Sequence, residues 1–262
     1  MEPIPSHQKF HDHFSGHSAD YARFRPTYPP EMFSVLAGLC ERRQTAWDVG
    51  TGSGQAALLL AEHFDRVLAT DPSAEQIRQA GYHPRINYTV ASAETSNLPD
   101  HSVDLICVAQ ALHWFDFAGF FSECDRVAKP GCVLAAWCYE LLTITPEIDG
   151  IITRYYRDIV GDFWPAQRSH IEARYTSIPF PYPSISTPEF SMRCDWTLGN
   201  LLGYLNTWSA TRRYEAARSF NPLTLIHEEL ASCWSEPDLK RVVIFPLTLL
   251  VFRVKPVDHP AS

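Results

Sequence analysis

A glycine-rich turn directly after a short apolar segment constrains the fold of this chain more than any other feature. The segment Thr45–Val49 is followed by glycines at positions 50, 52 and 54, and Asp71 ends the next apolar segment. In a βαβ unit such a turn lets the backbone approach a flat ligand, and an acid after the second strand accepts hydrogen bonds from ribose hydroxyls. The pattern predicts a nucleoside-binding crevice at the edge of a parallel sheet.

The glycine spacing separates two kinds of nucleoside ligand. A dinucleotide fingerprint needs its third glycine one position later, where this chain has Gln55. NAD is therefore disfavoured, and S-adenosylmethionine is the ligand that we expect. The alternative, a tight turn whose glycines only relieve steric strain or that binds NAD, stays open at this point.

Strands and helix-like segments alternate from residue 30 to 138, which is the pattern of a parallel sheet with helices on both faces. We expect strands at 45–49, 66–70, 86–91, 102–109 and 132–138, and helices at 31–42, 55–64, 73–81 and 117–129. Beyond residue 139 we expect a loop or extended segment at 176–188, strands at 190–196 and 242–254, and helices at 198–215 and 223–234.

Composition narrows the function classes. The formal net charge of −8, with no local cluster of Lys and Arg, disfavours nucleic acid as a partner. Seven cysteines without a C-x-x-C pair are typical of a reducing cytosol, so a cytoplasmic location is expected. No apolar run reaches membrane-spanning length, and we expect no membrane association. The sequence leaves the oligomeric state open.

Further pieces follow the glycine turn in a recognisable order. They are Asp48 before the glycines, Asp71-Pro72-Ser73, Ala91-Ser92-Ala93-Glu94, Leu98-Pro99-Asp100 and the apolar segment 102–108. This series resembles the class I S-adenosylmethionine-dependent methyltransferases, within them the type 11 group that includes the trans-aconitate methyltransferases, over residues 10 to 140. The resemblance implies a Rossmann-like α/β fold with a seven-stranded, mostly parallel sheet whose last strand is antiparallel.

The resemblance also implies a division of the chain. Residues 1–30 would form an N-terminal lid, 31–140 the cofactor-binding core, and 141–262 the substrate-side helices and final strands of the same domain. The cofactor would be S-adenosyl-L-methionine, and the partner a small-molecule methyl acceptor.

Cofactor-binding residues are expected where the strands end. Asp48 would hold the methionyl ammonium or cap the turn, and Asp71 would hold the ribose. Ser92 stands where the family has an acid for the adenine amino group, and Glu94 either takes part or is an acid at a helix N-terminus. Arg25 would bind the methionyl carboxylate or form a surface salt bridge. The full predicted set is Tyr21, Arg25, Asp48, Gly50, Thr51, Gly52, Asp71, Pro72, Ser92, Ala93, Glu94 and Gln110.

Catalytic and acceptor-binding residues are expected in three segments. His113 and Trp114 follow the fourth strand and would face the transferred methyl group, or His113 is a packed core residue. Tyr28, Trp208 and Arg212 are the predicted substrate-binding residues. Trp208 and Arg212 share a helix face and suit a carboxylate, or they form an aromatic core stripe with an outward arginine. The segment 208–214 also resembles the corresponding part of the trans-aconitate methyltransferases, which implies a small acid as acceptor.

Four histidines near the N-terminus, at positions 7, 11, 13 and 17, form two pairs with the spacing of metal ligands on a helix. The segment is terminal and has no flanking core, so we expect no metal site. The leading hypothesis is methyl transfer from S-adenosylmethionine to oxygen of a small carboxylic acid. The alternatives are an N- or C-methyltransferase of another metabolite and a non-catalytic S-adenosylmethionine-binding regulatory protein.

Overall fold

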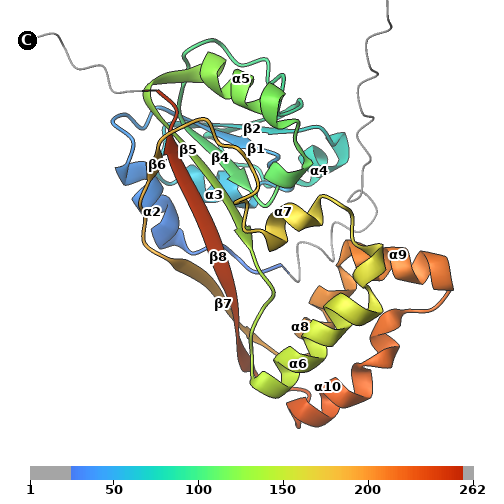
Figure 1. Cartoon of the computed structure of the whole chain (residues 1–262). Coiled ribbons are helices and arrows are strands. Elements are labelled where there is room, and N and C mark those ends of the chain that lie inside the picture. The colour runs from blue at the N-terminus through green and yellow to red at the C-terminus, as the bar shows by residue number, and fades with distance from the viewer. Residues whose placement is uncertain (1–24, 256–262) are drawn as a thin grey trace, which may run out of the picture.

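Five parallel strands form the centre of the computed structural model, which describes residues 25–255 (Figure 1). Their order across the sheet is β3-β2-β1-β4-β5. Every residue of β1 is buried, as expected for a central parallel strand covered on both faces. The chain order reverses between β1 and β4, and open sheets of this type bind ligands at that point. The strands are β1 (Thr45–Val49), β2 (Arg66–Asp71), β3 (Ile86–Val90), β4 (Val103–Ala109) and β5 (Ala128–Tyr139).

The sheet continues beyond β5 with a long antiparallel strand, β8 (Arg241–Arg253). Two strands pair antiparallel with β8: β6 (Ser184–Ile185) and β7 (Phe190–Trp196). The predicted Rossmann-like α/β fold with an antiparallel last strand is confirmed. The sheet has eight strands rather than seven, because the non-proline pair Ser184–Ile185 forms a short strand within the proline-rich segment.

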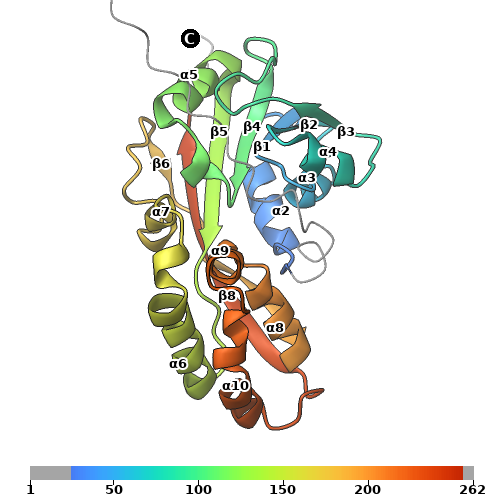
Figure 2. The same ribbon diagram turned by 90° about the vertical axis from the view of Figure 1, so that its right-hand side faces the viewer.

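Helices cover both faces of the sheet (Figure 2). On one face, α2 (Pro30–Gly38) and α3 (Gln55–Leu60) bury residues in a core shared with Ala46, Cys107 and Trp137. On the other face, α5 (Phe117–Val127) packs on a second core that contains Trp47 and Ile106. The small helix α4 (Ala74–Gln79) connects β2 to β3. Alternate residues of one strand therefore enter different cores, as the pleat requires.

Four helices gather around the lower half of β8 in Figure 2, and we call them the helical cap. They are α6 (Pro146–Arg154), α8 (Leu198–Asn206), α9 (Ser209–Arg218) and α10 (His227–Trp234). A π-helical turn (Tyr155–Ile159), a 3-10 turn (Gly161–Phe163) and α7 (Arg168–Glu172) lead from α6 back towards the sheet. Among residues 25–255, no helix is long and apolar enough to cross a membrane.

The predicted helix 198–215 is wrong in one respect, because it is two helices. Trp208 adopts an extended backbone (φ −65°, ψ 134°) between α8 and α9, and its buried side chain joins an aromatic cluster. The predicted helix 223–234 likewise divides into a 3-10 turn (Pro222–Leu225) and α10. The first break lies at the extended backbone of Trp208 and the second at Ile226 (φ −124°, ψ −6°), and helix periodicity indicates neither.

Candidate cofactor and acceptor site

The turn after β1 has the geometry that a close ligand requires. Gly50 and Gly52 have backbone φ angles of +67° and +56°, values that residues with a side chain rarely adopt. A Cβ on Gly50 would lie 2.7 Å from the Cβ of Ala111, so this glycine is needed for packing. A Cβ on Gly52 would meet nothing closer than the Oε1 of Gln76 at 3.8 Å. The space beside Gly52 is therefore open, and a ligand can approach the backbone there.

Asp48, at the end of β1, has a buried oxygen that lacks a hydrogen-bond donor. Its Oδ2 accepts a 2.5 Å hydrogen bond from Thr51 Oγ1, whereas Oδ1 has no partner among the described residues. Burial, with a smaller contribution from the charge of nearby Asp71, raises the pKa of this carboxyl to about 7 despite the hydrogen bond from Thr51. Because an unpartnered buried acceptor costs free energy, Oδ1 is suited to receive a donor such as a ligand ammonium. The residues at this turn fit the methionyl end of S-adenosylmethionine.

Asp71, at the end of β2, is buried and ties that strand to the glycine turn. Its Oδ2 accepts from the backbone N–H of Gly52 at 2.9 Å, and its Oδ1 accepts from the N–H of Ser73 at 2.8 Å. Pro72 lies between these two anchors, and Ser73 caps α4. The carboxylate therefore stands beside the open space at Gly52, where ribose hydroxyls would reach it.

The segment after β3 carries the residues predicted for adenine. Ala93 is buried and Ser92 is half-buried, in a bridge with Thr95. Glu94 Oε1 accepts a 3.0 Å hydrogen bond from the backbone N–H of Asp116, the residue before α5. Glu94 itself lies in a turn rather than at the start of a helix, so this contact is with the start of α5, and the adenine role of Glu94 stays a prediction.

The ends of β4 and β5 are joined through Gln110. This residue has a φ of +56°, and its Oε1 accepts a 3.0 Å hydrogen bond from the N–H of Tyr139. A left-handed backbone at a residue with a side chain is unusual and clusters at functional sites. Gln110 thereby connects the cofactor edge of the sheet to Tyr139, which the sequence analysis did not identify.

His113 lies in a 3-10 turn (Leu112–Trp114) after β4. It is buried, its Nδ1 lies 3.2 Å from the hydroxyl of Tyr175, and its ring centroid is 4.8 Å from that of the half-buried Trp114. Burial, with a smaller contribution from the positive charge of Arg168, lowers the pKa of His113 to about 3. The side chain is neutral at physiological pH.

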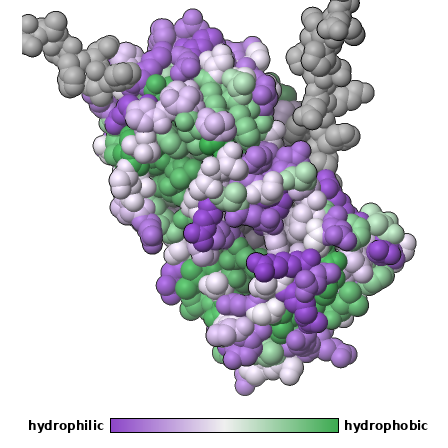
Figure 3. Space-filling model, in the orientation of Figure 1, coloured by the Kyte–Doolittle hydropathy of each residue, from purple (hydrophilic) through white to green (hydrophobic). Residues whose placement is uncertain are grey.

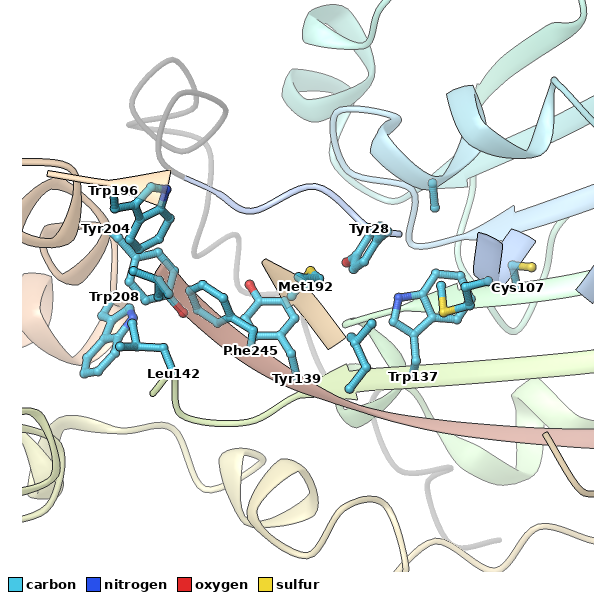
Figure 4. Packing of buried hydrophobic residues seen from close by; sticks show 14 of the residues in the cluster. Tyr28, Cys107, Trp137, Tyr139, Leu142, Met192, Trp196, Tyr204, Trp208 and Phe245 are labelled. Atoms are coloured by element: carbon cyan, nitrogen blue, oxygen red, sulfur yellow. The ribbon is translucent and has the colours of Figure 1, made fainter. Parts of the chain in front are cut away.

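Arg25 and Tyr28 lie at the start of the described chain and contact residues that are distant in sequence. Arg25 donates from Nη1 to the hydroxyl of Tyr139, and its Cζ lies 5.5 Å from the ring centroid of Tyr204. Tyr28 is buried and packs edge-on against Trp137, with 5.5 Å between ring centroids. Figure 4 shows these tyrosines along the end of β5 and the neighbouring part of β8. Tyr21 lies outside the described residues.

Trp208 and Arg212 lie in the helical cap. Trp208 packs against several rings and is 4% exposed. The Arg212 Nη1 lies 3.5 Å from Glu215 Oε2, in an ion pair on the same helix. Their substrate-binding role stays a prediction, and the aromatic packing matches the core stripe that was the alternative. No group of three or more metal-ligating side chains forms among residues 25–255, and the four N-terminal histidines lie outside that range.

Comparison with known proteins gives one consistent assignment. Residues 47–136 match the type 11 family described as a methyltransferase domain. A putative methyltransferase of Dictyostelium discoideum is 34% identical over 240 residues, which cover 90% of this chain and 91% of its own length. An uncharacterized methyltransferase of Mycobacterium tuberculosis is 39% identical over 113 residues, 42% of this chain and 45% of its own.

A solved structure extends the match to three dimensions. The structure of a putative type II methyltransferase from Anaeromyxobacter dehalogenans is 42% identical, with a TM-score of 0.84, covering 88% of this chain and 99% of its own. These matches confirm the predicted class I methyltransferase family and the predicted cofactor. The chain belongs to the methyltransferase family, in the Rossmann-like class I whose enzymes use S-adenosyl-L-methionine.

Proposed function

We propose that this enzyme transfers the methyl group of S-adenosylmethionine to a carboxylate oxygen of a small acid in the cytosol. The observation that carries the proposal is the state of His113, the titratable member of the predicted catalytic pair. A pKa of about 3 and a contact with Tyr175 make it a poor proton acceptor at neutral pH. An acceptor that is already an anion needs no base, and a carboxylate meets this condition.

The chain's own residues would hold the cofactor through its polar groups. Asp48 Oδ1 would accept from the methionyl ammonium, and Asp71 would accept from the ribose hydroxyls. The bound cofactor supplies an electrophilic methyl group on a sulfonium. Gln110 joins the ends of β4 and β5 through its hydrogen bond from the Tyr139 N–H. It would thereby keep the residues at these strand ends, next to the acceptor, in a fixed position relative to the methyl group.

Two further observations support an acidic acceptor. The Arg25 guanidinium lies over the rings of Tyr139 and Tyr204, and the hydrogen bond from Gln55 Nε2 to the carbonyl of the adjacent Pro26 holds this segment beside the glycine turn. A positive charge there suits the carboxylate of an acceptor as well as the methionyl carboxylate predicted for it. The sequence resemblance to trans-aconitate methyltransferases at residues 208–214 points in the same direction. For the cytosolic location, the support is that all seven cysteines are free thiols and five of them are buried.

A product analysis tests the proposal. The enzyme is incubated with methyl-labelled S-adenosylmethionine and a panel of small acids, with the matching amides and amines as controls. A methyl ester releases labelled methanol on mild alkaline hydrolysis, whereas N-methyl and C-methyl products do not. Base-labile label with acids supports O-methylation, and base-stable label would favour the N- or C-methyltransferase alternative.

A further inference from the structure

A cavity of about 360 Å³ opens between the turns that follow α6 and the start of α7. Its volume lies within the range of small-molecule sites. Tyr156, Trp164 and Arg168 form part of its wall, and Arg157 and Glu172 also line it. Figure 3 shows a hollow with a hydrophilic rim near the middle of the face on which Figure 1 shows α7 above α6.

Arg168 contacts two aromatic rings in this cavity and donates a hydrogen bond to the hydroxyl of one of them. Its Cζ lies 4.5 Å from the ring centroid of Trp164 and 5.3 Å from that of Tyr156. Its Nε donates a 2.9 Å hydrogen bond to the hydroxyl of Tyr156, which itself donates to Glu172 Oε1 at 2.6 Å. The indole of Trp164 is fixed by a 3.2 Å hydrogen bond to the carbonyl of Tyr156.

The remaining edge of the Arg168 guanidinium is available to a ligand. Among residues 25–255, neither of its Nη atoms has an ion-pair or hydrogen-bond partner. Glu172, the acid in the wall, is engaged by the Tyr156 hydroxyl, and Arg157 adds a second positive charge. A planar guanidinium with two unpaired Nη atoms matches a carboxylate bidentately, and the half-buried indole of Trp164 lines the same cavity.

The cavity adjoins the predicted reaction site. Helix α7, which begins with Arg168, packs against the turn that carries His113, and the charge of Arg168 reaches His113. From the cap side, the rings of Tyr156 and Trp164 lie 5.7 and 5.4 Å from that of Trp208. The cavity thus lies between two groups of residues predicted for catalysis and substrate binding.

We propose that this cavity is an entrance subsite for planar carboxylates, in which the Nη atoms of Arg168 bind the acid group and Trp164 packs against the ring. The inference rests on the proposed function and deepens it, because it names the class of acceptor as aromatic or conjugated acids. It makes Arg168 a specificity-determining residue of the enzyme.

Benzoate is the probe, with the neutral benzamide as its isostere. Binding to the full chain is followed by tryptophan fluorescence without any methyl donor, and Trp164→Phe identifies the responding indole. Wild type should bind benzoate saturably and benzamide at least about tenfold more weakly. Arg168→Gln should lower the affinity for benzoate by at least about tenfold. Arg168→Lys keeps the positive charge but loses the planar guanidinium, so its benzoate affinity should lie between those of wild type and Arg168→Gln.

Arg174→Gln is the matched control, because it removes the same charge from an exposed residue that pairs with Glu140 close to α7. It should leave benzoate affinity within about twofold, given the small contribution of surface ion pairs. Unchanged S-adenosylhomocysteine affinity in Arg168→Gln shows that the fold is intact.

Absence of saturable benzoate binding, or equal benzoate affinity in Arg168→Gln and wild type, would overturn the inference. The binding measurement contains no methyl donor and is therefore independent of methyl transfer. Benzoate binding that depends on Arg168 would support the subsite even if the enzyme forms no ester from acids. Ester formation with no effect of Arg168→Gln on benzoate affinity would leave O-methylation standing and remove the subsite.

Discussion

Thr51 donates a 2.5 Å hydrogen bond from its hydroxyl to one oxygen of Asp48, and the other oxygen is buried with no donor from residues 25–255. The pair places an acid with a pKa of about 7 at the glycine turn of the cofactor site. In the free enzyme this buried oxygen without a donor costs free energy, and a bound ammonium group would remove that cost. Binding of the cofactor and protonation of Asp48 should consequently be linked.

Cofactor binding is expected to release protons near neutral pH. An ammonium beside Asp48 stabilises the ionised carboxylate, so about half a proton per site should be released at pH 7. Titration calorimetry with S-adenosylhomocysteine in two buffers of different ionisation enthalpy measures this number. Asp48→Asn should abolish the release and weaken binding. A proton count that is the same in wild type and Asp48→Asn would contradict the assignment.

The same substitution should change the stability of the free enzyme in the opposite direction. The pKa of Asp48 rises from an ordinary 3.8 to about 7 in the folded chain, so the native state holds an extra proton between these values. The free energy of unfolding contributed by Asp48 therefore falls as pH rises from about 4 to 7. At pH 8, Asp48→Asn should raise the melting temperature without ligand, which thermal unfolding followed by circular dichroism would show.

Asp71→Ala should weaken S-adenosylhomocysteine binding by about 1.5 to 3 kcal/mol, the range for hydrogen bonds to a charged group. The Asp71 carboxylate also accepts a hydrogen bond from the N–H of Gly52, so its removal should make the glycine turn less ordered. Asp65→Ala, at an exposed position just before β2, provides the control. Equal affinities of the two variants in titration calorimetry would remove Asp71 from the ribose site.

Gly52→Ala should damage cofactor binding more than stability. An added Cβ would meet no atom closer than 3.8 Å. The free energy of unfolding should therefore fall only by the cost of placing alanine in the left-handed backbone region, about 1–2 kcal/mol. Gly131→Ala is the control, because Gly131 also has a positive φ, and its added Cβ would lie 3.3 Å from the terminal carboxylate oxygen of the Glu41 side chain. Both variants should lose similar unfolding free energy in denaturant titrations, while only Gly52→Ala should lose cofactor affinity. Equal cofactor affinity in the two variants would place the ligand elsewhere.

The sheet and the cofactor edge could be predicted from the sequence because their signals are local. Asp48 and Asp71 end strands that periodicity identifies, and parallel strands bring such ends to one edge. The glycine spacing indicated the open turn at Gly52 for the same reason. Each of these inferences needed only neighbouring residues and the geometry of a βαβ unit.

The contacts on the candidate acceptor side could not be predicted, because they join residues that are distant in the sequence. Arg25 meets Tyr139 across 114 positions, and His113 meets Tyr175 across 62. The segment from 140 to 175, which supplies Arg168, folds into short and irregular helices without a clear period. Tertiary packing rather than local preference decides such segments.

Glu123 should make the enzyme sensitive to acid. Burial alone would raise the pKa of this carboxyl, but hydrogen bonds from Arg126 and Ser96 outweigh it and lower the pKa to about 2. The stability from these contacts is complete above pH 4.5 and is lost as pH falls from there towards 2. Glu123→Gln should destabilise the fold at pH 7 by up to about 3 kcal/mol and flatten its acid dependence. The exposed Glu62→Gln should do neither in urea titrations at several pH values.

His113→Gln separates a catalytic base from a packed histidine. The contact with Tyr175 and the low pKa predict a positioning role, so the loss of this buried partner should cost about 1–3 kcal/mol of unfolding free energy. Turnover on an acid that serves as acceptor should stay within about tenfold of wild type, whereas loss of a general base typically costs about 100- to 10,000-fold. Tyr175→Phe, which removes only the hydroxyl, should reproduce part of the stability loss and leave turnover unchanged. A rate loss above 100-fold in His113→Gln, together with loss of a titration near its pKa in the pH–rate profile, would make His113 catalytic.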